Sequence, residues 1–117
     1  MAEGSNYETR SADRRPAARR RVLLPGLIVY AHGAFTCDCT IRNLSASGAR
    51  IHANQHLQFP NRFYVINIRD GLAYDARVVW SDGAGVGIKF EATVTLSSNP
   101  DAAPGYLKRL WLAKVPR

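Results

Sequence analysis

Apolar and polar residues alternate along this chain with a period of two, and this pattern constrains the fold more than any other feature of the sequence. The alternation is clearest in residues 35–42, 72–80 and 86–91. It places apolar side chains on one face of an extended segment and polar side chains on the other, as in half-buried antiparallel strands. Three further segments alternate less regularly but are rich enough in β-branched and aromatic residues to predict strands: 22–31, 49–53 and 63–69.

Turn-forming residues separate the six predicted strands. They are His32-Gly33, Ser45–Gly48, Asp70-Gly71 and Asp82-Gly83, and Pro60-Asn61 ends the longest connection. Six short strands with no long helix between them predict an all-β fold, a closed six-stranded antiparallel β-barrel over residues 21–91. Closure also removes the exposed strand edges that a small open sheet would leave.

Residues 92–117 are predicted to form a linker and a short C-terminal helix. Asp101 is suited to the N-cap, and Pro104 to the first turn, where its missing N–H does no harm. Apolar residues then recur at helical spacing: Leu107, Leu110 and Trp111. We expect this helix to cover one mouth of the barrel.

Most of the net positive charge lies in one stretch near the N-terminus, residues 10–21. The 117-residue chain has 16 Lys+Arg and 9 Asp+Glu, for a net charge of +7. Six arginines fall within residues 10–21 and are opposed only by Asp13, so that this stretch is +5 and the remainder only +2. We predict a flexible arginine-rich arm, residues 1–20, attached to a nearly neutral domain, with an anionic partner.

The two cysteines and the hydropathy of the chain indicate its compartment. Cys37 and Cys39 would point to the same face of one strand, where their neighbouring positions give poor disulfide geometry. We predict small buried thiols in a reducing cytoplasm. No run of 18 apolar residues occurs, so we expect no membrane span.

No residue pattern in the chain indicates catalysis. The histidines, His32, His52 and His56, do not stand at metal-ligand spacing with a carboxylate or thiol. The glycine-rich run 83–87 leads into a predicted strand and not a helix, which indicates a turn and not a phosphate-binding loop. We therefore expect no enzymatic activity, no cofactor and no metal.

Two short motifs stand out on this background. The first is R-x-x-x-R, formed by Arg15 and Arg19 and flanked by Arg14, Arg20 and Arg21. The second is [D/N]-x-S-x-x-G at the end of the second predicted strand, formed by Asn43, Ser45 and Gly48. Each motif is weak alone, but the two in this order on a barrel pattern are much more specific.

With these motifs the chain resembles the PilZ domains, a family that binds the bacterial second messenger cyclic di-GMP. The resemblance extends from Asp13 to Glu91, and residues 77–80 and 86–90 look like the closing hairpin of the family. It implies a single-domain receptor, without an attached output domain, whose N-terminal arginines wrap a ligand on the barrel surface. It also implies that binding changes the conformation and signals to a further, unidentified protein that controls motility, adhesion or exopolysaccharide.

The resemblance implies that cyclic di-GMP is bound by residues of both motifs: Arg14, Arg15, Arg19, Arg20, Asn43, Ser45 and Gly48. Arginine suits this ligand because its planar fork pairs with phosphate oxygens and with guanine O6 and N7, and stacks on a purine. Asn43 can accept from guanine N–H groups, Ser45 can bond a phosphate or brace the turn, and Gly48 permits close backbone approach or positive φ. In the family, a basic residue before the first clamp arginine accompanies a stacked pair of ligands, and Arg14 occupies that position.

Two departures from the family pattern leave alternatives open. Asn43 stands where the family often has Asp, and another register would place Ala17 and Arg21 at the clamp positions in place of Arg15 and Arg19. A PilZ-like adaptor that has lost the ligand is therefore an alternative function.

A basic small barrel that binds nucleic acid is another alternative. Against it, we see no row of exposed aromatic residues, because Tyr74 and Trp80 share the predicted inward face. Trp80 could pack beneath a base, but packing in the core or at a barrel mouth fits this position better. Arg42 and Arg50 flank the second motif and are predicted to be solvated surface charges. Electrostatic docking of the arm on a membrane is a further, weaker alternative.

Overall fold

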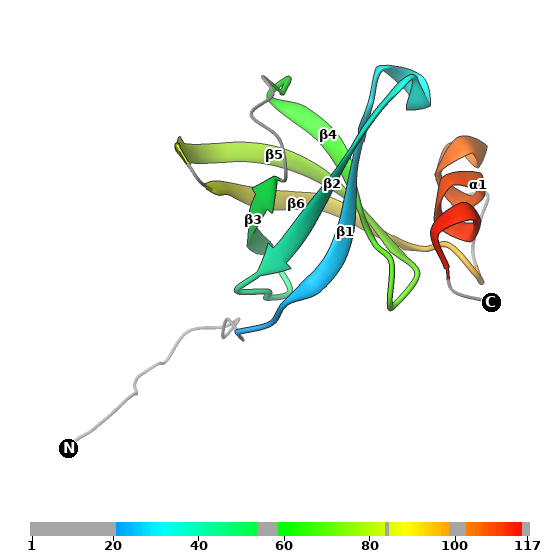
Figure 1. Cartoon of the computed structure of the whole chain (residues 1–117), viewed down its shortest axis with the longest axis horizontal. Helices are drawn as coiled ribbons and strands as arrows, with labels where there is room; N and C mark the ends of the chain where they lie inside the picture. The colour runs from blue at the N-terminus through cyan, green and yellow to red at the C-terminus, as the bar shows by residue number, and fades with distance from the viewer. Residues whose placement is uncertain (1–20, 54–58, 84, 99–102, 116–117) are drawn as a thin grey trace.

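The computed structural model describes residues 21–53, 59–83, 85–98 and 103–115, and six antiparallel strands dominate this part of the chain (Figure 1). The strands are β1 (Leu24–Tyr30), β2 (Phe35–Arg42), β3 (Gly48–Ala53), β4 (Arg62–Asn67), β5 (Leu72–Asp82) and β6 (Gly85–Thr95). A 3-10 turn, η1 (Ala31–Gly33), joins β1 to β2, and one helix, α1 (Gly105–Lys114), follows the sheet. All six predicted strands are present.

The strands close into a barrel in the order β1-β2-β3-β6-β5-β4. Consecutive strands pair as hairpins, with the exception of β3 and β4. Instead, β3 pairs with β6 and β1 pairs with β4, which closes the barrel. The prediction of a closed six-stranded antiparallel barrel is thus confirmed. The predicted arm, residues 1–20, lies outside the described residues.

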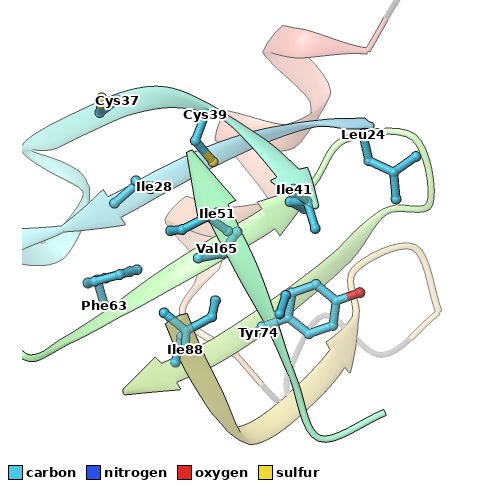
Figure 2. Close-up of a cluster of buried hydrophobic side chains, with 12 residues drawn as sticks. Leu24, Ile28, Cys37, Cys39, Ile41, Ile51, Phe63, Val65, Tyr74 and Ile88 are labelled. Carbon is cyan, nitrogen blue, oxygen red and sulfur yellow. The ribbon is translucent and has the colours of Figure 1, made fainter. Parts of the chain in front are cut away.

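Alternate residues of every strand point into the barrel and form one apolar core (Figure 2). Its buried members are Leu24, Ile28, Cys37, Cys39, Ile41, Ala49, Ile51, Phe63, Val65, Tyr74, Ala76 and Ile88. Both cysteines are free and buried, as predicted. Desolvation by burial, together with the neighbouring Cys37, raises the pKa of Cys39 to about 12, so the thiol is neutral at ordinary pH.

A second apolar cluster lies outside the barrel, between its wall and α1. Leu27 and Val29 of β1 and Ile66 of β4 point outward and pack with Leu107 of the helix. Strands β1 and β4 are therefore buried on both faces, which is why their residues alternate less regularly in the sequence. The helix covers this outer wall and not a barrel mouth, so the expected position of the helix was wrong (Figure 1).

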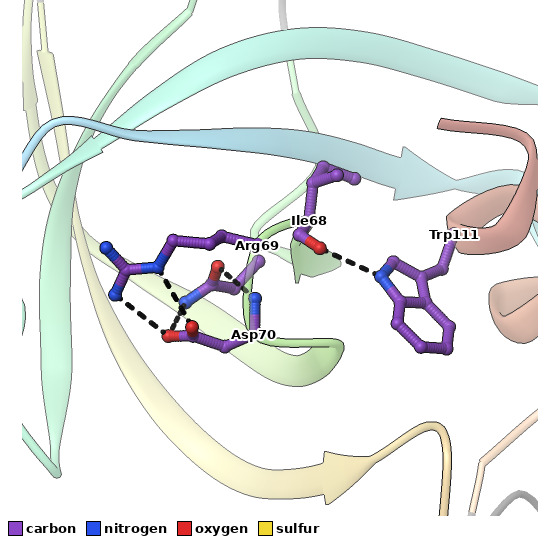
Figure 3. Close-up of polar contacts among 5 residues, drawn as sticks. Ile68, Arg69, Asp70 and Trp111 are labelled. Atoms are coloured by element: carbon purple, nitrogen blue, oxygen red, sulfur yellow. Dashed lines mark hydrogen bonds and ion pairs between the residues drawn. The ribbon is translucent and has the colours of Figure 1, made fainter. Parts of the chain in front are cut away.

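The helix is held to the wall by polar contacts as well as by apolar packing. Trp111 donates its indole Nε1–H to the carbonyl oxygen of Ile68 at 2.9 Å (Figure 3). Lys114 donates to the Asp38 carboxylate on β2 at 2.9 Å. Pro104 precedes the helix as its N-cap residue and does not lie in the first turn as predicted; the predicted cap, Asp101, falls outside the described residues. Since Pro104 has an extended ψ of 138°, the helical conformation starts only at Gly105.

Candidate functional site

The turn between β2 and β3 contains the second sequence motif and is held by its own hydrogen bonds. The backbone N–H of Ser45 donates to the Gly48 carbonyl at 2.9 Å. The Ser45 hydroxyl accepts from the backbone N–H of Gly48 at 3.2 Å and from that of Ser47 at 3.3 Å. Ser45 therefore braces the turn, which is one of the two roles that the sequence allowed.

The first and last residues of the motif are required by the backbone. Asn43 has a φ of 48°, in the left-handed region that asparagine and aspartate tolerate better than other side chains. Gly48 is not among the residues with positive φ; a Cβ placed on it would collide with the carbonyl oxygen of Ile88 on β6. Of the two reasons considered for a glycine here, close backbone approach is the one that applies.

An open cleft of about 690 Å³ lies beside this turn and is named here the arginine cleft. Its lining residues are Arg21, Val22, Leu23, Arg42, Asn43 and Arg50. Within the described part of the chain, no acidic side chain lines the cleft. Three guanidinium groups beside one polar amide make it suited to an anionic ligand.

The arginine cleft is the point at which the arginine-rich N-terminal segment joins the barrel. Arg21 and Val22 follow directly on residues 1–20 and line the cleft. The predicted clamp residues themselves fall outside the described residues: Arg14, Arg15, Arg19 and Arg20. Their role therefore stays a prediction.

A second cavity, of about 440 Å³, lies on the other side of the same turn. It is lined by Leu44, Ser45, Ala46, Leu72, Tyr74, Phe90 and Thr93. Tyr74 and Phe90 stack in parallel there, with ring centroids 4.0 Å apart. Asn43 therefore lines the arginine cleft, and Ser45 lines the second cavity.

Trp80 differs from its predicted place. Tyr74 is buried inside the barrel as expected, but Trp80 keeps 39% of its surface exposed. The pairing of β5 with β6 shifts register between Val78 and Trp80, and this irregularity interrupts the alternation of faces. The indole lies directly over Gly87 of β6, where a Cβ would collide with it. The predicted inward orientation of Trp80 was wrong.

Arg42 and Arg50 were expected to be solvated surface charges; Arg42 is exposed, the Arg50 side chain is 37% exposed, and both line the open arginine cleft. They are opposite each other in the pairing of β2 with β3. The guanidinium carbon of Arg50 lies 5.3 Å from the centre of the Trp80 ring, and one of its nitrogens lies 3.8 Å from the Asp82 carboxylate. The predicted turn, Ser45–Gly48, does not itself indicate this pairing, because Arg42 lies three residues before it and Arg50 two residues after it.

Metal-ligating side chains do not gather into a cluster in the described residues. No group of three His, Cys, Asp or Glu residues in that part of the chain could hold a metal ion. Among the acidic groups, Glu91 has a lowered pKa because Arg77 donates a hydrogen bond to it, but this pair lies on the exposed surface of β5 and β6. No helix in the described ranges has the length and apolar character to cross a membrane.

Comparison with known proteins adds one finding. A family model described as PilZ domain matches residues 9–99, which is well over half of the chain and includes both motifs and the whole barrel. A comparison with curated proteins finds no match.

Proposed function

Since the chain belongs to the PilZ domain family, we propose that it is a receptor for cyclic di-GMP and that the nucleotide binds in the arginine cleft. The observation that carries this proposal is the place of the cleft. It lies between the root of the arginine-rich segment and Asn43, the first residue of the second motif. Arg21, two residues after the first motif, and Asn43, the first residue of the second, both line this positively charged hollow.

Each motif supplies a different part of the proposed site. Arg15 and Arg19, with Arg14 and Arg20 beside them, bind the phosphates and guanine edges from the N-terminal segment. From the barrel, Asn43 accepts hydrogen bonds from a guanine; its left-handed backbone conformation fixes the direction of its side chain.

The other two motif residues shape the site in this proposal. The hydroxyl of Ser45 is engaged within the turn, which supports a role in holding Asn43 in place. Gly48 lets β3 approach β6 closely at the end of the turn.

The proposal extends to how the receptor acts. Arg14 precedes the first clamp arginine, which supports binding of a stacked pair of nucleotides. Closure of the N-terminal segment on the ligand changes the surface around the cleft, and a downstream protein recognises this change. We place the receptor in the bacterial cytoplasm, a location that the free thiols of Cys37 and Cys39 support. In this role the protein binds its ligand and does not transform it.

Isothermal titration calorimetry with cyclic di-GMP tests the proposal. The wild-type protein should show saturable binding at micromolar concentration or below, with two nucleotides per chain if a stacked pair binds. Arg15→Ala and Arg19→Ala should each abolish measurable binding, whereas Arg10→Ala, a matched loss of charge in the same segment, should change the affinity less than about 3-fold.

Three results would contradict the proposal. Absence of heat from the wild-type protein would favour an adaptor without ligand. Equal affinity in all three variants would refute the clamp residues. Steeply salt-dependent binding to arbitrary oligonucleotides, without preference for cyclic di-GMP, would favour a nucleic-acid binder.

A further inference from the structure

The barrel wall itself carries a pair of arginines that line the arginine cleft. Arg42 and Arg50 are cross-strand partners on β2 and β3, and both line the arginine cleft. Both residues border the same cleft, so an anion bound there is attracted by both guanidinium groups.

The hairpin of β5 and β6 is built to hold the side chain of Arg50. A Cβ on Gly85 would lie 2.8 Å from Nε of Arg50, and a Cβ on Gly87 would collide with the Trp80 indole. Glycine weakens a strand interior, and it often marks a place where another group approaches closely. Here two glycines of β6 make room for Arg50 and for the aromatic ring beneath it.

The counterion of Arg50 is weak and easily replaced. The nearest oxygen of Asp82 lies 3.8 Å away, beyond hydrogen-bond distance, and the Asp82 side chain is 60% exposed. The other Asp82 oxygen accepts from the backbone N–H of Gly85 at 3.0 Å and so helps to close the hairpin. The guanidinium of Arg50, with its carbon 5.3 Å from the centre of the Trp80 ring, therefore has donors available for a ligand in the cleft.

We infer that Arg42 and Arg50 form a phosphate-binding pair on the barrel wall, separate from the arginines of the N-terminal segment. The pair takes one phosphate group between two planar guanidinium forks, each of which can donate paired hydrogen bonds. That this phosphate belongs to cyclic di-GMP rests on the proposed function. The pair then binds one end of the nucleotide to the rigid sheet.

The two tryptophans of the chain provide a direct readout, the indole N–H signals of the 15N-labelled protein in NMR spectra. Trp80 lies beneath Arg50, whereas Trp111 lies against Ile68 on the helix side and serves as an internal control. The probes are cyclic di-GMP and inorganic pyrophosphate. The variants are Arg42→Gln and Arg50→Gln, with Arg109→Gln on the exposed face of α1 as the matched control.

We expect both probes to shift the Trp80 signal and to leave the Trp111 signal in place. Arg50→Gln and Arg42→Gln should each weaken cyclic di-GMP binding by about 10- to 100-fold, as expected when a hydrogen-bonded charge is lost. Arg109→Gln should change the affinity less than about 2-fold. Arg50→Lys keeps the charge but loses the fork, so it should restore only part of the affinity. An unchanged Trp111 signal in each variant shows that the fold is intact.

The outcomes separate this inference from the proposed function. If the wild-type protein binds cyclic di-GMP and Arg42→Gln and Arg50→Gln leave the affinity unchanged, the Arg42–Arg50 pair is overturned and the proposal of a cyclic di-GMP receptor stands. A loss of affinity without a wild-type Trp80 shift also overturns the pair, because Arg50 then acts only through its long-range field. If cyclic di-GMP does not bind, but pyrophosphate shifts the Trp80 signal and Arg50→Gln abolishes that shift, the receptor proposal is overturned and the Arg42–Arg50 pair is supported. Failure of both probes overturns both.

Discussion

Gly48→Ala is expected to loosen the junction of β3 with β6 and the turn that carries Asn43. The added Cβ would overlap the carbonyl oxygen of Ile88, which belongs to the backbone of the neighbouring strand and cannot rotate away. The two strands must therefore move apart next to two short hydrogen bonds. These are the bonds from Ser45 N–H to the Gly48 carbonyl at 2.9 Å and from Phe90 N–H to the Ser47 carbonyl at 2.8 Å.

The size of the effect follows from these contacts. Forcing an extra methyl group into a packed site costs about 1–3 kcal/mol, and weakening one backbone hydrogen bond adds about 1 kcal/mol. We expect Gly48→Ala to lower the free energy of unfolding by about 2–4 kcal/mol, which is a large part of the about 5–15 kcal/mol typical of a domain. Urea denaturation followed by tryptophan fluorescence measures it.

Gly83→Ala is the matched control for this experiment. Nothing lies within 4 Å of a Cβ at Gly83, and its φ is not positive, so the same substitution should change the free energy of unfolding by less than about 0.5 kcal/mol. Equal stability of the two variants would refute the reasoning, because it would mean that β3 and β6 are not in close backbone contact at Gly48.

Two further substitutions and one labelling experiment test ligand affinity, stability and burial separately. Asp82→Asn removes the competing charge near Arg50 but keeps an acceptor for Gly85 N–H. The affinity for cyclic di-GMP, measured by calorimetry, should therefore rise about 2- to 5-fold at low salt. Unchanged or weaker binding would contradict the role given to Asp82. Trp111→Phe loses the bond to Ile68 and should cost about 1 kcal/mol in urea denaturation without altering ligand affinity; an altered affinity would contradict it. Cys39, buried and with its pKa raised to about 12, should resist a thiol reagent at pH 8 until urea unfolds the protein; rapid labelling of the native protein would contradict this burial.

Sequence periodicity predicted the barrel well where one face of a strand meets solvent. In β2 the inward residues Cys37, Cys39 and Ile41 alternate with exposed ones, and the predicted bounds agree with the observed strand. In β1 the pattern is blurred because Leu27 and Val29 pack under α1. The position of that helix could not be predicted locally, because it depends on which outer wall of the barrel is apolar.

Parts of the site also escaped prediction for physical reasons. The orientation of Trp80 depends on a register shift between β5 and β6, which no alternation within β5 reveals. Asn43 and Gly48 were singled out by their motif, and the local backbone favours these residue types at both positions. The roles of Arg42 and Arg50 depend on the cross-strand register, which pairs them although they stand at unequal distances from the predicted turn. Residue type alone could not separate them from ordinary surface charges.

A structure of the complex with cyclic di-GMP would show directly where the nucleotide binds. We expect it in the arginine cleft, with phosphate oxygens within hydrogen-bond distance of Arg15 or Arg19 on one side and of Arg50 on the other, and a guanine against Asn43. A well-ordered nucleotide bound elsewhere on the barrel, with the arginine cleft empty, would contradict this expectation.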